Sequence, residues 1–335
     1  MSLPDRSIGP YRVSAISLGC MNLSHAYGGY PARKDAIRLL QQALDLGVTM
    51  LDTAALYGDG DNERLLGEAI MHRRGEFILA SKCVLGMFNG KRGLDGSPEA
   101  ISRTLHAALE RLRTDHIDIY YLHRLDARVP IEDSVGALVR AKEAGLIGAI
   151  GLSEMSAATL RRAHAVHPIA AMQSEYSPIV RNPEVAVLKA CHELGTAFVA
   201  FSPLGRGLLA ESIKSDDYAP GDIRKGMARF VEPQLSENLR IVDAFEAIAA
   251  REGLTPAQLS LAWVLAQGEN IVAIPGTRNV DHLRANVGAV DSLVSQSVLN
   301  EVTDLFPPNA LAGPRYSAAA QAQIDTELLP NEPVA

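Results

Sequence analysis

Four residues of the sequence have the types and the order that proton transfer to a carbonyl oxygen requires. They are Asp52, Tyr57, Lys82 and His123. A tyrosine hydroxyl titrates at about pH 10, and a nearby ammonium lowers its pKa toward the range in which it acts as a general acid. We therefore predict that Lys82 lowers the pKa of Tyr57 and that Asp52 holds Lys82 in its charged form. His123 is predicted to donate a hydrogen bond to the carbonyl oxygen, so that the set could reduce a C=O group facing a hydride donor.

Each of the four residues also has a plain structural interpretation. Asp52 could cap a helix, Tyr57 could be an ordinary loop aromatic, and Lys82 could be a solvated surface lysine. His123, which precedes Arg124, could belong to a surface ion pair. The chemistry therefore depends on whether the chain brings the four side chains together, and that depends on the elements that carry them.

Short apolar runs alternate along the chain with longer stretches of helical periodicity. The short runs predict eight strands, at Ala15–Gly19, Thr49–Asp52, Phe77–Ser81, Ile117–Leu122, Ile147–Leu152, Ala170–Gln173, Ala197–Ser202 and Val272–Pro275. The predicted helices are Ala36–Leu46, Glu63–Met71, Pro98–Leu112, Ile131–Ala144, Ala157–His167, Pro183–Leu194, Leu239–Arg251 and Pro256–Gln267. Parallel neighbours need a crossover connection, so this alternation indicates βαβ units whose strands are covered on both faces.

Eight such units predict a (β/α)8 TIM barrel, although periodicity alone leaves an open, doubly wound sheet as the alternative. We expect residues 1–335 to form one barrel domain. A polar stretch from Gly205 to about Glu237 predicts a long loop after the seventh strand, which is typical of a lid or a binding loop. The residues from Pro307 onward predict a C-terminal extension over the surface or the barrel mouth.

The barrel architecture predicts where the chemistry lies, because active sites of this fold are found at the carboxyl ends of the strands. Asp52 and Tyr57 follow the second predicted strand, Lys82 the third and His123 the fourth. The next three strands also end beside polar side chains, which are Ser153, Gln173 and Ser202. The four residues are therefore expected to meet at one mouth of the barrel.

Composition narrows the class of protein. The 335 residues carry a formal net charge of −7, which argues against a general nucleic-acid or anionic-membrane binder. Cys20, Cys83 and Cys191 are widely spaced without a CxxC pair, which is typical of a reducing compartment rather than a disulfide framework. The first residues lack a signal-peptide pattern and no apolar run is long enough to span a bilayer. We expect a soluble, cytoplasmic protein.

The sequence resembles the aldo/keto reductase superfamily over nearly its whole length. The resemblance is carried by ordered, widely spaced blocks: Leu51–Gly58 with Glu63 and Leu66–Gly67, Ala80–Lys82, Asp118–Arg124 and Gly148–Ser153. It implies that Asp52, Tyr57, Lys82 and His123 form the catalytic tetrad. The likeness is greatest to a bacterial and plant branch that includes reductases related to potassium-channel β subunits. The residues shared with that branch include His123–Asp126, Gln173–Ser177, Asp222–Arg224, Arg229–Phe230 and Ala312–Tyr316.

The resemblance also implies a binding site for NADPH. The expected cofactor-binding residues are Met21, Asp52, Ser153, Gln173, Phe201, Ser202, Pro203, Leu204, Gly205, Gly207, Ile274, Gly276, Thr277, Arg278, His282 and Asn286. Within this set, Ser153 and Gln173 would hold the nicotinamide carboxamide, Phe201 would stack on the ring, and the Gly205–Gly207 turn would approach the pyrophosphate.

A fork from Arg278 onto the adenosine 2′-phosphate, with Thr277 beside it, is the reason to expect NADPH rather than NADH. Asn286 would contact the adenine. Glu154 stands where many members have Asn, and Ala285 replaces a usual Glu.

The sequence thus predicts an NADPH-dependent enzyme that reduces small aldehydes or ketones, with Tyr57 as the general acid. Cys20, Tyr27, Tyr57 and His123 are the candidate substrate-binding residues. The main alternative is a cofactor-holding regulatory subunit that senses redox state and turns over slowly. A metal-dependent barrel hydrolase would need clustered ligands, which the scattered histidines do not provide, so no metal is expected. Monomer and homo-oligomer both remain open.

Overall fold

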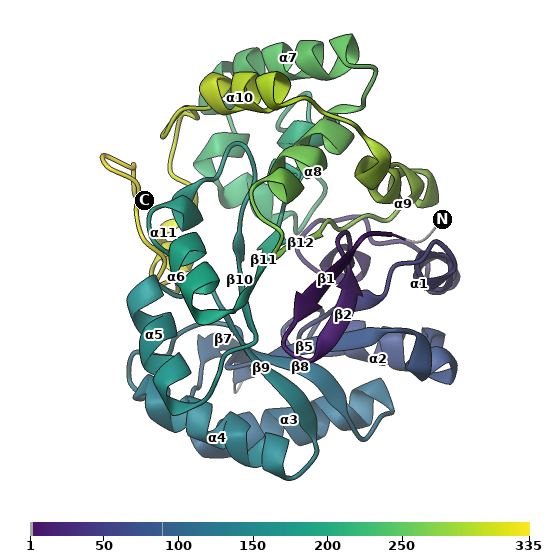
Figure 1. The fold of residues 1–335 in the computed structure, drawn as a ribbon, viewed down its shortest axis with the longest axis vertical. Coiled ribbons are helices and arrows are strands. Elements are labelled where there is room, and N and C mark those ends of the chain that lie inside the picture. The colour runs from purple at the N-terminus through teal and green to yellow at the C-terminus, as the bar shows by residue number, and fades with distance from the viewer. Residues whose placement is uncertain (1–2, 89) are drawn as a thin grey trace.

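A barrel of eight parallel strands forms the centre of the molecule (Figure 1). The computed structural model describes residues 3–88 and 90–335. The barrel strands are β3 (Leu18–Gly19), β4 (Met50–Asp52), β5 (Ile78–Cys83), β8 (Ile117–Leu122), β9 (Ile147–Ser153), β10 (Ala171–Glu175), β11 (Ala197–Phe201) and β12 (Ile271–Ile274). Hydrogen bonds from Ser17 N–H to the Ala273 carbonyl and from Ala273 N–H to the Ala15 carbonyl, each 2.9 Å, join the first and last strands. This closure confirms the (β/α)8 barrel and excludes the open sheet.

Helices surround the barrel and connect its strands (Figure 1). They are α1 (Arg33–Asp45), α2 (Asp61–Ala69), α3 (Pro98–Leu112), α4 (Ile131–Glu143), α5 (Ala157–Val166), α6 (Val187–Leu194), α7 (Gln234–Arg251), α8 (Pro256–Ala266), α9 (Val280–Val287), α10 (Gln296–Leu305) and α11 (Ala318–Gln321). Short 3-10 turns add η1 (Met21–Leu23), η2 (Met71–Glu76), η3 (Asn182–Glu184), η4 (Gly205–Ala210), η5 (Ile223–Gly226), η6 (Ala228–Phe230) and η7 (Gly288–Asp291). In the described part of the chain, no helix is both long and apolar enough to cross a membrane.

Alternation along each strand divides the core into an outer and an inner layer. In β8, Tyr120 and Leu122 pack in the outer layer against the helices, whereas Ile119 and Tyr121 pack in the inner layer inside the barrel. Successive side chains of a strand point to opposite faces, so a strand buried on both faces reads as one continuous apolar run. Gly151 of β9 is required in the inner layer, because a Cβ atom there would clash with the Tyr121 ring.

An antiparallel hairpin, β1 (Asp5–Ile8) and β2 (Tyr11–Ser14), covers the amino-terminal end of the barrel and lies in front of the strands in Figure 1. Ile8 and Val13 are fully buried and belong to the inner layer of the core. The Tyr11 ring lies so close to Gly148 that a Cβ atom there would clash with its hydroxyl. This end of the barrel is therefore filled by apolar side chains.

Most predicted elements are present, with shifted ends. The Ser97 and Ser156 hydroxyls accept from the Ala100 and Thr159 N–H groups, so these serines cap α3 and α5. The predicted helix at Pro183–Leu194 begins later, at Val187, because Ala186 has non-helical backbone angles.

The sequence analysis missed two hairpins and three helices. The missed elements are the β1–β2 hairpin, a second hairpin of β6 (Leu85–Phe88) and β7 (Lys91–Leu94), and the helices α9, α10 and α11. The predicted long loop ends early, because α7 begins at Gln234, and it contains the 3-10 turns η4 to η6.

Candidate active site

The alternation of the strands decides which polar side chains enter the barrel. Met50 of β4 and Ala80 of β5 belong to the inner layer of the core. Asp52 and Lys82 lie two positions further along the same strands, so they point into the barrel above them. The same step leads to Ser153 after Gly151 in β9, Gln173 after Ala171 in β10, His123 after Tyr121 in β8 and Phe201 after Val199 in β11. The site is thus the polar continuation of the inner core at the carboxyl end of the barrel.

Asp52, Lys82 and Tyr57 form a buried hydrogen-bonded trio. The Lys82 ammonium donates to Asp52 Oδ1 in a short contact, to the Thr53 carbonyl oxygen at 2.9 Å and to the Tyr57 hydroxyl oxygen at 3.3 Å. Gln173 Nε2 donates to the other carboxylate oxygen of Asp52 at 2.8 Å. Lys82 is fully buried and Asp52 is 2% exposed, so this ion pair is shielded from solvent. The structure therefore brings these predicted residues together as the sequence analysis expected.

The protonation of the trio differs in part from the prediction. Burial raises the pKa of Tyr57 above its usual 10.0 and outweighs the opposite effect of Lys82. The prediction is right about the direction of the Lys82 effect and wrong about the net shift, because the sequence does not show how far the hydroxyl is removed from water. Burial also opposes charging of Lys82, but Asp52 and then Tyr57 raise the pKa of Lys82 overall. At neutral pH the trio contains an ammonium and a protonated tyrosine.

The His123 ring packs edge-on against the Tyr57 ring. The two ring centroids are 5.9 Å apart and the rings are nearly perpendicular, at 83°. Burial lowers the pKa of His123 well below its usual 6.5, and the charges of Arg124 and Lys82 lower it further. No group in residues 3–88 and 90–335 forms a hydrogen bond with the buried His123 Nδ1. The imidazole is therefore neutral at pH 7 and can donate one hydrogen bond.

His25 completes the surroundings of Tyr57, and the sequence analysis missed it. Its ring stacks on the Tyr57 ring with centroids 5.6 Å apart and an interplanar angle of 23°. The Gly58 N–H donates to His25 Nδ1 at 3.4 Å. Burial, with a smaller contribution from Arg92, lowers the pKa of His25 to about 4. His25 follows the first barrel strand. The criterion used for the other strands, a polar side chain after the strand end, also identifies it.

The residues expected to hold the nicotinamide lie beside the trio. Ser153 and Gln173 are buried, and they are paired in the register of β9 and β10. Ser153 Oγ accepts from Arg124 Nη1 at 3.4 Å. Phe201 is partly exposed at the end of β11. A partly exposed ring above buried amide and hydroxyl groups fits a planar heterocycle that carries a carboxamide.

The loop after β11 is a tight turn of left-handed backbone. Gly205, Arg206 and Gly207 have positive φ angles of 56°, 56° and 101°. The Gly205 and Gly207 N–H groups donate to the Ser202 and Leu204 carbonyl oxygens at 2.9 and 3.0 Å, so these two donors are already used within the turn. A Cβ atom at Gly205 would clash with Ile179, so glycine is required there. The Pro203 carbonyl accepts from the Ser260 hydroxyl at 2.6 Å, which fixes this loop to α8.

The Arg278 side chain is held by hydrogen bonds to the backbone of the loop after β3. Its Nη1 donates to the carbonyl oxygens of Gly28 and Gly29, each at 2.6 Å, and so joins the β12–α9 loop to the loop after β3. The Thr277 hydroxyl donates to the Asn279 carbonyl at 3.2 Å. In the described residues, the other guanidinium nitrogens of Arg278 have no hydrogen-bond partner, which leaves one side of its planar fork for a phosphate.

Three further predicted cofactor residues lie in β12 and α9, and Met21 lies in η1 after β3. Ile274 and Asn286 are buried, His282 is exposed and Met21 is partly buried. A Cβ atom at Gly276 would approach Asn22 Oδ1 to 2.9 Å, so only glycine leaves this passage open. The residues present here fit a dinucleotide that extends from the trio toward Arg278.

Cys20 and Tyr27, two of the predicted substrate residues, lie in different surroundings. Cys20 is fully buried in the outer core layer, and its thiol faces the Leu18 carbonyl oxygen at 3.7 Å. This placement contradicts a substrate contact for Cys20, because the side chain turns toward the helices rather than into the barrel. Tyr27 is 8% exposed and lies under the Arg224 guanidinium, 4.9 Å from its ring centroid. Tyr27 therefore joins the loop after β3 to the long loop.

A buried cluster ties the C-terminal extension to this end of the barrel. We call it the tail clamp, and its members are Glu154, Glu175, Arg206, Arg315 and Tyr316. Arg206 donates two hydrogen bonds to the Glu175 carboxylate, at 2.9 and 2.8 Å. Glu154 accepts from the Glu175 N–H at 2.8 Å and from the Tyr316 hydroxyl at 3.2 Å. Arg315 lies over the Tyr316 ring at 4.8 Å. The sequence analysis noted Glu154 only as a departure from Asn, so the clamp was missed.

Comparisons with known proteins agree with this fold and site. The sequence profile of the Aldo/keto reductase family matches residues 15–306. One relative is the aldo-keto reductase yakc of Schizosaccharomyces pombe, whose name specifies NADP(+). The two sequences are 41% identical, and the match covers 98% of this chain and 100% of the relative. The probable aldo-keto reductase 1 of Glycine max is 39% identical over 91% of this chain and 89% of its own length.

Solved structures show the same barrel. A glycerol dehydrogenase from Gluconobacter oxydans has a TM-score of 0.81 at 25% identity, over 91% of this chain and 94% of its own. An aldo/keto reductase from Klebsiella pneumoniae, solved with NADP and acetate, has a TM-score of 0.72 at 26% identity. The match covers 93% of this chain and 100% of that structure's chain. With the family profile and the 41% identical relative, these findings show that the chain belongs to the aldo/keto reductase family and is an NADP-dependent oxidoreductase.

Proposed function

We propose that the protein reduces small aldehydes or ketones to alcohols, with Tyr57 as the general acid. The observation that supports this proposal is the Lys82 ammonium at 3.3 Å from the Tyr57 hydroxyl inside a buried pocket. When bound, NADPH supplies the hydride that reaches the carbonyl carbon. Tyr57 gives its proton to the carbonyl oxygen, and Lys82 stabilises the phenolate that remains until water returns a proton.

Two further residues orient the reaction. Asp52 keeps Lys82 charged and in place through their buried ion pair. His123 is neutral and donates a hydrogen bond to the same carbonyl oxygen, so that two donors face the developing negative charge. Such preorganised donors act strongly here because the pocket excludes water.

NADPH is proposed to lie along the carboxyl ends of β9 to β12. Ser153 and Gln173 would bind the carboxamide, Phe201 would stack on the ring, and Arg278 would bind the 2′-phosphate. Loss of Arg278 should therefore weaken NADPH more than NADH, because NADH has no 2′-phosphate.

The test is steady-state oxidation of NADPH and NADH with a panel of small aldehydes, ketones and quinones. We expect reduction with NADPH, and a loss of about a hundredfold or more in kcat for Tyr57→Phe, which removes the donated proton but keeps the ring. Unchanged reduction by Tyr57→Phe would sink the proposed role of the hydroxyl. Tight NADPH binding without turnover would favour the redox-sensing alternative.

A further inference from the structure

The β6–β7 hairpin covers Tyr57 with one of its two faces. Leu85 and Leu94 are opposite each other in the hairpin register and pack in one cluster with Tyr57. Side chains alternate between the faces of a strand, so Arg92 lies on the same face as Leu94. Lys91 lies on the opposite face. Arg92 therefore extends from the hairpin over the site beyond Leu94.

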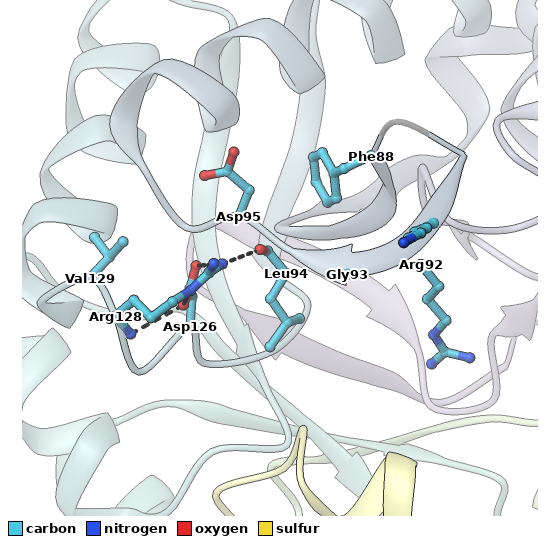
Figure 2. Close-up of a pocket in the computed structure, with 9 residues that line it drawn as sticks. Phe88, Arg92, Gly93, Leu94, Asp95, Asp126, Arg128 and Val129 are labelled. Atoms are coloured by element: carbon cyan, nitrogen blue, oxygen red, sulfur yellow. Dashed lines mark hydrogen bonds and ion pairs between the residues drawn. The ribbon is translucent and has the colours of Figure 1, made fainter.

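Figure 2 shows the direction of the Arg92 side chain. A surface pocket of about 390 Å³ lies between this hairpin and the loop after β8, lined in part by Asp95, Asp126 and Arg128. Arg128 is paired with Asp126 at 2.8 Å. The guanidinium of Arg92 points away from these carboxylates, on the other side of the hairpin (Figure 2).

Arg124 approaches the same place from the barrel. It follows His123, and its Nη1 donates to the His123 carbonyl at 2.6 Å and to Ser153 Oγ at 3.4 Å. After burial, the charge of Arg124 contributes to the lowered pKa of His123 and of Arg92. Arg124 thus borders the site from the barrel, beside His123 and Ser153, and Arg92 extends toward it from the hairpin face that packs on Tyr57.

In the described part of the chain, neither the exposed Arg92 nor Arg124 forms an ion pair. In residues 3–88 and 90–335, no carboxylate lies within ion-pairing distance, 4.0 Å, of Arg92 or Arg124. The nearby carboxylate of Asp126 is satisfied by Arg128 and by the Gly96 N–H at 3.0 Å. Two like charges beside a buried histidine repel each other, so the arrangement favours an anion between them.

We infer that Arg92 and Arg124 form an anion subsite, and that the preferred substrates are aldehydes or ketones that carry a carboxylate. The carbonyl oxygen would lie at Tyr57 and His123, and the carboxylate would lie between the two guanidinium groups. Arginine suits this role because its planar fork matches a carboxylate with two parallel hydrogen bonds. This inference rests on the proposed function and adds the substrate class.

The experiment compares carboxylated and neutral aldehydes of equal chain length. Reduction by NADPH is measured with 4-oxobutanoate and butanal, and with 6-oxohexanoate and hexanal. We expect a kcat/KM at least tenfold higher for at least one carboxylated member of these pairs. Arg92→Gln should lower this preference about tenfold, while Arg92→Lys, which keeps the charge but loses the fork, should lower it less. The preference should also fall as salt is raised.

Lys91→Gln is the matched control, because it removes one positive charge from the neighbouring position on the opposite face of the hairpin. It should leave the preference unchanged. An equal loss in Lys91→Gln and Arg92→Gln would overturn the subsite in favour of general charge attraction. Reduction of neutral aldehydes at equal or better kcat/KM than the carboxylated ones would also overturn it. Failure to reduce any of the four aldehydes would instead contradict the proposed function.

Discussion

At the scale of single residues, burial decides the protonation of the site. Tyr57, His123 and His25 all lie in the same pocket, and burial is the largest influence on the pKa of each. The same removal from water raises the pKa of the tyrosine and lowers those of the two histidines, because it penalises whichever form is charged. The residue types that meet could be predicted from the sequence. Their net pKa shifts could not, because those depend on packing from several elements.

These shifts predict the pH dependence of carbonyl reduction. Tyr57 donates only while protonated, and its raised pKa keeps it protonated through neutral and mildly alkaline pH. His123 loses its charge at a pKa well below 6.5, so it stays neutral as pH rises above that value. We expect kcat/KM for a neutral aldehyde to stay level between about pH 6 and about pH 9. The profile should be measured at saturating NADPH. An inflection at about pH 6.5 would show a histidine that titrates normally and would contradict this assignment.

At the scale of elements, the C-terminal extension acts on the predicted cofactor loop through the tail clamp. Arg206 stands in the middle of the positive-φ turn Gly205–Gly207, and its side chain is held by Glu175 at the end of β10. Burial opposes both charges, but each partner keeps the other ionised: the pKa of Glu175 is lowered and that of Arg206 is raised. The clamp thus fixes the shape of the loop from the side of Glu175 in β10.

Loss of this pair should weaken NADPH binding. Glu175→Gln leaves the Arg206 guanidinium buried without a counter-ion, so the turn that borders the proposed cofactor path is expected to shift. We expect the Kd for NADPH to rise about tenfold, which corresponds to about 1.4 kcal/mol, mainly through faster dissociation. Fluorescence titration and stopped-flow release measure this. Lys214→Gln is the control. It breaks an ion pair between the exposed Lys214 of the long loop and Glu246 of α7. A lower Tm with an unchanged Kd would mean that the pair is only structural.

The same scale shows what sequence patterns can and cannot reveal. The strand at Ile117–Leu122 was predicted to the residue because it is a fully buried apolar run between turns. The β6–β7 hairpin, with Lys91, Arg92 and three glycines in it, has no such run, and in the described residues its strands pair with each other. Its position over Tyr57 depends on the contacts of Leu85 and Leu94. For this reason the predicted tetrad was brought together as expected, whereas Arg92 and the tail clamp required the structure.

At the scale of the whole molecule, the two ends of the barrel are built for different purposes. The carboxyl end collects Asp52, Lys82 and the other polar side chains, with an ion pair buried at its centre. The amino end is filled by Ile8, Val13 and their apolar neighbours, which contribute burial. Stability and chemistry should therefore respond separately to substitutions at the two ends.

Ile8→Ala tests this separation. Ile8 is fully buried between the hairpin and the barrel strands, so its truncation leaves a cavity and should lower the free energy of unfolding by about 2–5 kcal/mol. The kcat/KM for a neutral aldehyde should stay within about twofold of the unsubstituted protein at a temperature where both are folded, because the loss lies at the opposite end from Tyr57. Val166→Ala, at a position that is 42% exposed, is the matched control and should change stability by less than about 0.5 kcal/mol. Denaturant unfolding measures the free energy of unfolding, and steady-state kinetics on the same preparations measure kcat/KM. A loss of activity in Ile8→Ala as large as its loss of stability would show that the two ends are coupled through the barrel, since Ile8 and Tyr121 belong to one buried inner layer.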